Sequence, residues 1–255
     1  MDILWLGMLA LLLTGYFALE GFDIGLGMLL PVLGRSQRDR DRIVAAMAPF
    51  VLANEVWLVA AAGVLFGAFP EAEGKVLFGL YPLVVALLVS WILRDAGLWF
   101  RRRADGRVWR AAWDWTICGA SCGLALSWGT ALVAMAGGLT GPMPVLPGLA
   151  GGTAVAGLFA LHGRTFVSWL LPGQVTAGRR NGWALLLSAC AAAAPAAALL
   201  AAAAPWLLRH AAPAGTLNVL SVMILPLTPL MVGAQVWVWR TFGPRRAADP
   251  VPSFF

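Results

Sequence analysis

Long apolar stretches dominate the chain, and only short polar segments separate them. Seven such stretches run over residues 3–31, 48–69, 76–99, 114–138, 149–171, 182–206 and 216–239. A helix needs about 20 apolar residues to cross the hydrocarbon core of a bilayer. Strands of a membrane barrel would instead alternate in polarity over about ten residues. The pattern therefore predicts an all-α integral membrane protein with about seven transmembrane helices.

These spans leave no room for a separate soluble domain, so we expect one transmembrane helical domain over residues 1–255. It would comprise a four-helix half over about 1–138, a shortened second half over about 149–240 and a short basic C-terminal tail over 241–255. The first span does not have the features expected of a cleavable signal peptide. It lacks a basic beginning, and it carries Glu20 and Asp23 where small residues would precede cleavage.

Charge orients the predicted spans. Charged residues make up 12% of the 255 residues, which is about half the share in a soluble domain. Fourteen of the 18 basic residues follow spans one, three, five and seven, namely Arg35, Arg38, Arg40, Arg42, Arg101, Arg102, Arg103, Arg107, Arg110, Arg179, Arg180, Arg240, Arg245 and Arg246. Cytoplasmic segments carry such an excess, so we expect the N-terminus outside and the C-terminus inside. The net charge of +6 then reflects topology and contact with membrane lipid, not nucleic-acid binding.

Polar residues inside the spans gather at one depth. They are Glu20 and Asp23 in span one, Asn54 and Glu55 in span two, Arg94 and Asp95 in span three, and His162 and Arg164 in span five. At 1.5 Å per residue, all of them fall in the cytoplasmic half, roughly 8–15 Å from its edge. Ionisable residues within spans face the bundle interior and are candidates for function.

The carboxylates suggest proton transfer. Glu20 and Asp23 are three residues apart and share a helix face, so one of them should hold a proton near neutral pH. Together with Glu55 they are our candidates for a proton path. The alternative is structural: Arg94 and Arg164 would neutralise Asp95 and a glutamate in buried pairs that only fix the order of the helices.

The remaining candidates have weaker signals. His162 could be a haem or metal ligand, a proton carrier or a hydrogen-bonded core residue. The other histidine, His210, is predicted on the opposite side, so we expect no metal and no haem bound by this chain alone. Trp113 and Asp114 would form an interfacial belt with a helix N-cap. Trp57 and Trp91 could line a lipid or quinone tail.

Several motifs, taken in order, resemble one known family. The segment from Gly21 to Gly27 (GFDIGLG) resembles the GFD-G-G signature of subunit II of cytochrome bd-type quinol oxidases. Further matching segments are Ala53-Asn54-Glu55-Val56-Trp57, Arg94-Asp95-Ala96-Gly97, Trp113-Asp114-Trp115, Leu161-His162-Gly163 with Arg179-Arg180, and Thr216 to Val219 with Pro226 and Gln235-Val236-Trp237. The order of the motifs along nearly the whole chain makes the resemblance specific.

The resemblance implies a complex in the bacterial plasma membrane. A partner, subunit I, would carry the haems, of b and d type, and the quinol site. This chain would pack beside it, support assembly, and supply protons or hold a structural quinone. The complex would oxidise quinol and reduce dioxygen to water, so the chain would be part of an oxidoreductase whose redox centres lie on the partner. The cofactors would supply the redox chemistry.

Two departures from the family pattern refine this expectation. Members with the full set of helices have nine, so the chain resembles a shortened member that lacks a pair between span six and the last span. The family commonly has an aspartate where this chain has Leu52. A proton path would then depend on Glu20, Asp23 and Glu55.

Two other functions remain open from the residues alone. A proton-coupled membrane transporter would suit seven helices with buried charges, although no matched pair of broken helices is evident in two halves. A purely structural or assembly subunit would suit the loss of the acid at Leu52.

Overall fold

The computed structural model describes residues 1–139, 145–176 and 180–244, and its described part is helical without a β-strand. The helices are α1 (Asp2–Leu33), α2 (Gln37–Ala68), α3 (Pro70–Gly79), α4 (Tyr81–Phe100), α5 (Arg107–Ala136), α6 (Val145–Leu170), α7 (Gly182–Arg209), α8 (Ala214–Ile224) and α9 (Leu227–Phe242). The predicted all-α class is confirmed. Arg179, Arg245, Arg246 and the rest of the predicted tail beyond Pro244 lie outside the described residues.

The number of spans agrees with the prediction once a bent pair is counted. Within the described residues, six helices are long and apolar enough to cross a membrane, and α8 with α9, bent by 41°, makes a seventh if the pair is one span. The bend falls at Pro226, which cannot continue the hydrogen-bond ladder of α8. The third predicted span is also divided, because Gly79 ends α3 and Pro82 lies in the first turn of α4.

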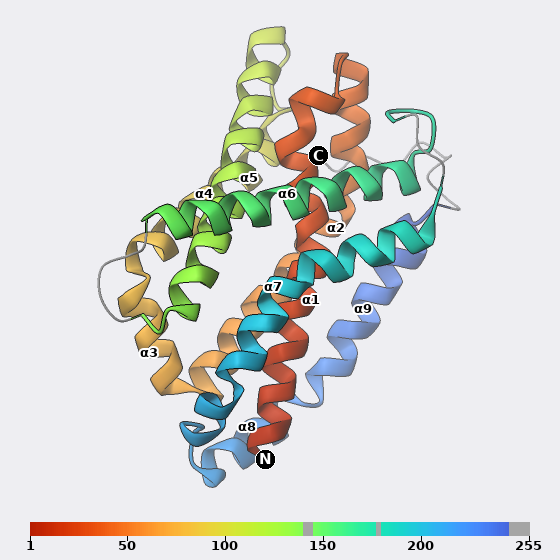
Figure 1. Cartoon of the computed structure of the whole chain (residues 1–255). Coiled ribbons are helices and arrows are strands. Elements are labelled where there is room, and N and C mark those ends of the chain that lie inside the picture. Colours follow the sequence, from red (N-terminus) through yellow and green to blue (C-terminus); the bar gives the residue numbers. More distant parts are fainter. Residues whose placement is uncertain (140–144, 177–179, 245–255) are drawn as a thin grey trace.

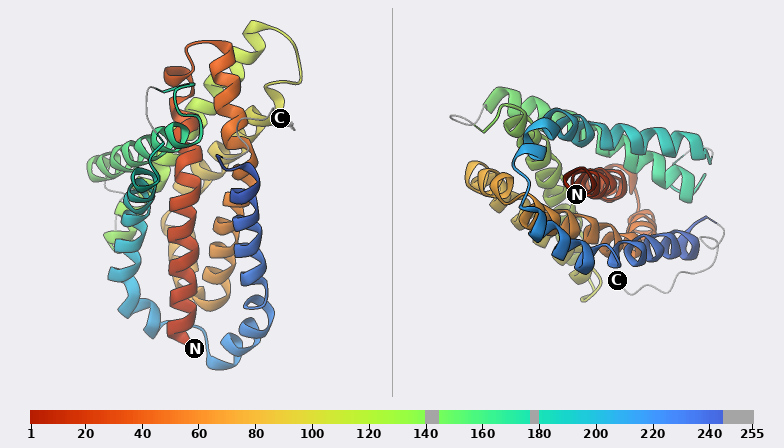
Figure 2. Two further views of the ribbon diagram at one scale, coloured as in Figure 1. Left: turned by 90° about the vertical axis from the view of Figure 1, so that its right-hand side faces the viewer. Right: turned by 90° about the horizontal axis from the view of Figure 1, so that it is seen from below.

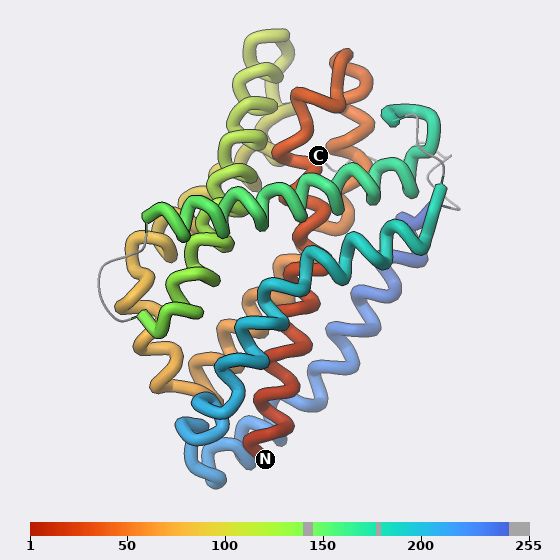
Figure 3. Tube along the Cα trace, in the orientation of Figure 1, coloured from red at the N-terminus to blue at the C-terminus, as the bar shows by residue number. Residues whose placement is uncertain are grey.

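Helix α1 runs through the middle of the bundle. It packs against α2, α5, α6 and α7, while α4 packs mainly on α5 and α9 lies along α2. The view from below shows α1 enclosed by the other helices (Figure 2). In Figure 1 and in the tube of Figure 3, α6 crosses in front of α1 at a steep angle instead of running beside it.

Glycines make this crossing possible. A Cβ on Gly25 of α1 would lie 1.8 Å from the carbonyl oxygen of Phe159 in α6, and a Cβ on Gly163 would lie 2.6 Å from the backbone nitrogen of Leu26. No side chain fits between backbones that approach so closely. The glycine-rich end of α1 is therefore a packing requirement of the α1–α6 contact.

The two ends of the bundle differ in charge. At one end α2 and α5 begin, and the arginines from Arg35 to Arg42 and from Arg101 to Arg110 gather there. Helix α2 starts at a capping box formed by Ser36 and Asp39, so several arginines predicted in a loop lie on its first turns. At the other end the backbone of Ala212 bonds to the carbonyl of Ala68, and the N-terminus lies there too (Figure 1). The side of the membrane that each end faces remains a prediction.

Candidate functional site

Arg94 is the centre of a buried ion cluster that joins three helices. Its guanidinium, 1% exposed, donates to Oε1 of Glu20 on α1 and to Oε1 of Glu55 on α2. It also lies 3.1 Å from Oδ1 of its neighbour Asp95. The indole of Trp91 donates to the same Glu55 oxygen at 2.7 Å. The long side chain of Arg94 thereby links α4 to both α1 and α2. We use the name acid cluster for Arg94 and the four acids Glu20, Asp23, Glu55 and Asp95.

Asp23 belongs to a second line of hydrogen bonds that reaches α9. The amide of Asn54 donates to Oδ2 of Asp23 at 2.7 Å and to the carbonyl of Leu19 at 3.1 Å. Gln235 on α9 donates to the Asn54 oxygen at 2.8 Å, and its own oxygen accepts from the indole of Trp57 at 3.1 Å. The polar residues of α1 and α2 are thus brought together, as their common depth predicted, and α9 holds them in place.

The acid cluster has more acids than bases. One cation, Arg94, faces the carboxyls of Glu20, Asp23, Glu55 and Asp95. Oε2 of Glu20 and Oδ1 of Asp23 are buried and have no hydrogen-bond partner in the described part of the chain. Burying uncompensated charge is costly, so the cluster can lower its charge by taking up protons. Chemically, it is a group suited to holding and exchanging protons.

His162 performs a different task. Its Nε2 lies 2.9 Å from the carbonyl oxygen of Ala18, which can only accept, so this nitrogen donates. In the neutral ring Nδ1 then accepts from the hydroxyl of Ser188, 2.8 Å away. His162 therefore links α6 to α1 and α7 as a hydrogen-bonded core residue.

The histidines do not suit a haem held by this chain. Both ring nitrogens of His162 are already bonded. His210 lies at the opposite end of the bundle, where its ring stacks on Trp206 with centroids 4.2 Å apart. Within the described residues no three His, Cys, Asp or Glu side chains are grouped to hold a metal ion.

A second buried cluster lies at the arginine-rich end, and we call it the basic-end cluster. Asp114 of α5 is fully buried and accepts from Arg101 Nε at 2.5 Å and from Arg40 Nη1 at 3.1 Å. Arg101, also fully buried, donates to Asp41 at 2.6 Å. Here each oxygen of Asp114 has a cationic donor.

The expected N-cap role of Asp114 is wrong. Helix α5 begins at Arg107 after Gly106, so Asp114 lies two turns inside the helix. The helix extends beyond its apolar stretch because polar and charged residues can form a helix where they meet water. Trp113 is half-buried and stacks on Phe100 with ring centroids 5.7 Å apart.

Arg164 also differs from the expectation of a buried arginine. Its side chain is exposed, and no described carboxylate pairs with it. The physical reason is helix geometry: Gly163 faces the backbone of α1, and the next residue turns about 100° away from that contact. Of the two arginines in the structural alternative, only Arg94 neutralises buried acids.

The sequence motifs do not predict the roles of two residues. Gln235 donates to Asn54, and the available signal for this contact is a glutamine within an apolar stretch, where a polar side chain needs a hydrogen-bond partner. Arg101 opens a run of three arginines that looks solvated, yet it is fully buried. Nothing local separates Arg101 from its neighbours, so only packing identifies it.

The fold and the site define a multi-pass α-helical membrane protein with a buried, acid-rich hydrogen-bond network. The model of the family described as cytochrome bd terminal oxidase subunit II matches residues 1–211. The chain belongs to this family, which confirms the resemblance of its motifs. The segment with Gln235 lies beyond the matched residues.

Curated relatives agree with the family. The cytochrome bd ubiquinol oxidase subunit 2 of Bacillus subtilis is 39% identical over 114 residues, which is 45% of this chain and 34% of the relative. The probable cytochrome oxidase subunit 2 of Haemophilus influenzae is 34% identical over 128 residues, 50% of this chain and 34% of the relative. The cytochrome bd-I ubiquinol oxidase subunit 2 of Escherichia coli K12 is 35% identical over 114 residues, 45% of this chain and 30% of the relative. The match thus spans about a third of each relative.

Proposed function

We propose that this chain is the subunit II component of a cytochrome bd-type quinol oxidase in the bacterial plasma membrane. It would pack beside a larger subunit I, and the complex would oxidise quinol and reduce dioxygen to water. Family membership supports this assignment, and it gives no support to the transporter alternative. The haems would belong to the partner, an assignment supported by the two histidine rings that are engaged elsewhere.

The second part of the proposal is that the acid cluster passes protons from the cytoplasm towards the oxygen site of the partner. The observation that carries it is the excess of buried carboxyls over cations, with one unpartnered oxygen on Glu20 and one on Asp23. A cluster with only a structural role would gain most from matched charges. Buried acids that can each hold or release a proton are what a relay requires.

Burial gives the proposed path a direction. The side chain of Asp95 is 27% exposed, that of Glu55 10% and that of Glu20 1%. A proton would enter at the exposed edge formed by Asp95 and Glu55 and move inward to Glu20 and Asp23. Arg94 would hold the acids at fixed positions while the protons move between them.

Isosteric amides test the relay. We expect Glu20→Gln with Asp23→Asn to preserve packing but to slow quinol-driven oxygen consumption at least about tenfold, equivalent to about 1.4 kcal/mol on the barrier. Assembly is measured separately, by co-purification of the larger subunit and the reduced-minus-oxidised haem spectrum. The matched control is Glu71→Gln with Asp105→Asn, which also replaces one glutamate and one aspartate by amides but at exposed positions outside the acid cluster, and it should leave turnover nearly unchanged.

The outcomes separate the two parts of the proposal. An assembled, haem-bearing complex in which the double variant turns over at the normal rate would refute the relay and favour a purely structural or assembly subunit. That role already has one supporting observation, because Arg94 ties α4 to α1 and α2. A folded wild-type chain that purifies from native membranes without a partner and without haem would contradict the oxidase assignment itself.

A further inference from the structure

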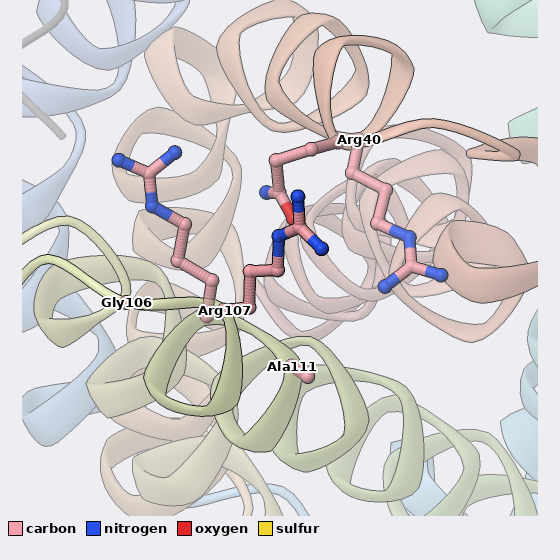
Figure 4. A pocket seen from close by; sticks show the side chains of 6 residues that line it. Arg40, Gly106, Arg107 and Ala111 are labelled. Carbon is pink, nitrogen blue, oxygen red and sulfur yellow. The ribbon is translucent and has the colours of Figure 1, made fainter.

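A pocket of about 660 Å³ opens at the arginine-rich end, next to the basic-end cluster, with which it shares Arg40. It lies between the first turns of α2 and the start of α5 (Figure 4). Its lining consists of Gln37, Arg40, Gly106, Arg107, Arg110 and Ala111. Three of these six residues are arginines, which offer guanidinium donors to an anion while their aliphatic stems form much of the wall. Such a lining is suited to an anion.

The positive charge at this pocket exceeds the local negative charge. Arg40 shares Asp114 with Arg101, so one carboxylate serves two guanidinium groups. Arg110 lies 4.0 Å from Asp41, a carboxylate that Arg101 also uses. The second acid near Arg110 is the fully exposed Asp105, 3.7 Å away.

Two of the lining arginines have unused hydrogen-bonding capacity. The Nη groups of Arg110 lie 4.0 Å from Asp41 and 3.7 Å from Asp105, too far for a hydrogen bond, so they can still donate to a ligand. Arg107 is exposed and has no carboxylate partner there. The arginine fork matches the oxygens of phosphate, with which it forms strong charge-assisted hydrogen bonds.

Backbone groups add to the preference for an anion. Helix α5 begins at Gly106 without a side-chain cap. Its first N–H groups and the positive end of its helix dipole therefore remain available next to Arg107. These backbone groups add to the positive electrostatic potential, most of which comes from the arginines.

We propose that this pocket binds the phosphate group of an anionic ligand through Arg107 and Arg110, with Arg40 and Gln37 on its opposite wall. The phosphate can come from the headgroup of an anionic phospholipid, because the pocket lies just beyond the apolar part of the helices, or from a soluble phosphate compound. This site is independent of the proposed relay and of the oxidase assignment.

The test measures phospholipid retention by the chain of residues 1–255. The purified protein is placed in phosphatidylcholine nanodiscs with a small fraction of phosphatidylglycerol, and bound lipid is counted by native mass spectrometry. We expect Arg107→Gln with Arg110→Gln to weaken retention of phosphatidylglycerol about tenfold, the equivalent of about 1.4 kcal/mol. Neither side chain is buried, so the fold should survive.

A matched control removes the same charge from the same end without touching the pocket. Arg35→Gln with Arg38→Gln changes two exposed arginines at the start of α2, and we expect less than about a twofold effect, since their influence is only long-range and screened. A third variant, Ala111→Trp, fills the pocket without changing charge and should weaken retention as the first does. Equal loss in the two arginine pairs, or normal retention in Ala111→Trp, would overturn the proposal.

A competition arm identifies the carrier of the phosphate. Inorganic phosphate is added at millimolar concentration to the wild-type protein, and retained phosphatidylglycerol is counted again. Displacement with phosphate bound in its place would assign the pocket to a soluble phosphate compound. Continued retention of phosphatidylglycerol over phosphatidylcholine would assign it to the lipid headgroup. Binding of neither probe by the wild-type protein would overturn the site altogether.

Discussion

The acid cluster and the basic-end cluster are both buried ion networks, but they are balanced differently. At the basic end, both oxygens of Asp114 accept from arginines. In the acid cluster, Arg94 forms ion pairs with several carboxyls, while Oε2 of Glu20 and Oδ1 of Asp23 have no hydrogen-bond partner among the described residues. Asp114 is paired with cations at both oxygens and so holds helices in register, although the arginines outnumber the acids there and Nη2 of Arg101 has no hydrogen-bond partner among the described residues. A surplus of acids leaves protons to be gained or lost, which is why we assign structure to the first network and proton exchange to the second.

The difference follows from where each network lies along the helices. The basic-end cluster joins the beginnings of α2 and α5, where water can reach nearby arginines. The acid cluster lies among apolar side chains within the predicted spans, where Arg94 is the one arginine that the described residues bring to it. Because each further charge there is costly to bury, an excess of acids needs a reason beyond packing.

The largest effect is expected from removing the only cation of the acid cluster. Arg94→Met should destabilise the chain by about 3–5 kcal/mol, because it leaves Glu20 and Glu55 buried without a partner. Thermal unfolding in detergent, with the yield of folded protein, measures this loss. The control is Arg164→Met, which removes an exposed arginine from a helix. If the two variants were equally stable, Arg94 would not hold the helices together.

A slightly smaller loss is expected at the basic end. Asp114→Asn should cost about 3 kcal/mol, since it leaves Arg40 and the buried Arg101 without their shared carboxylate. The comparison variant is Asp105→Asn, whose side chain is fully exposed and should change stability by less than about 0.5 kcal/mol. If Asp114→Asn were as stable as the wild type, the basic-end cluster would not have the structural role that we assign to it.

The hydrogen-bond line through α9 should have an intermediate effect. Gln235→Leu removes the donor to Asn54 and the acceptor for Trp57, and we expect about 1–3 kcal/mol of destabilisation from the polar groups left unpaired. Gln235→Glu sharpens the test, because a carboxylate can still accept from the indole but cannot donate to the Asn54 oxygen. A loss for the glutamate variant that lies between the wild type and the leucine variant in the same unfolding assay would show that both bonds contribute.

The smallest effect on stability is expected where acid is in surplus. Glu20→Gln keeps the shape of the side chain, and Arg94 retains Glu55 and Asp95, so the loss should stay below about 1 kcal/mol. Side-by-side unfolding of Glu20→Gln and Asp114→Asn compares the two clusters directly. If Glu20→Gln were the more damaging change, the surplus of acid would be only apparent and the proposed division of roles would fail.

Much of the site could be predicted from the depth of polar residues along each span. Glu20, Asn54, Glu55 and Arg94 share a depth in three spans, and the structure brings them into contact. Depth alone does not say which side of a helix faces inward, so it does not separate Arg164, which is exposed, from the buried residues at the same level. The same limit applies to Arg101, whose burial depends on the position of α5 against α2.

The amino-acid sequence by itself determined that this is a helical membrane protein, how many spans it has to within one, and which family it belongs to. Those properties depend on the length of apolar stretches and on local motifs, which can be read one segment at a time. Only the tertiary structure decided that Arg94 serves three acids, that Gln235 reaches Asn54, and that α6 crosses α1 where Gly25 and Gly163 meet. These features depend on how helices far apart in the chain pack against one another, and no single segment contains that information.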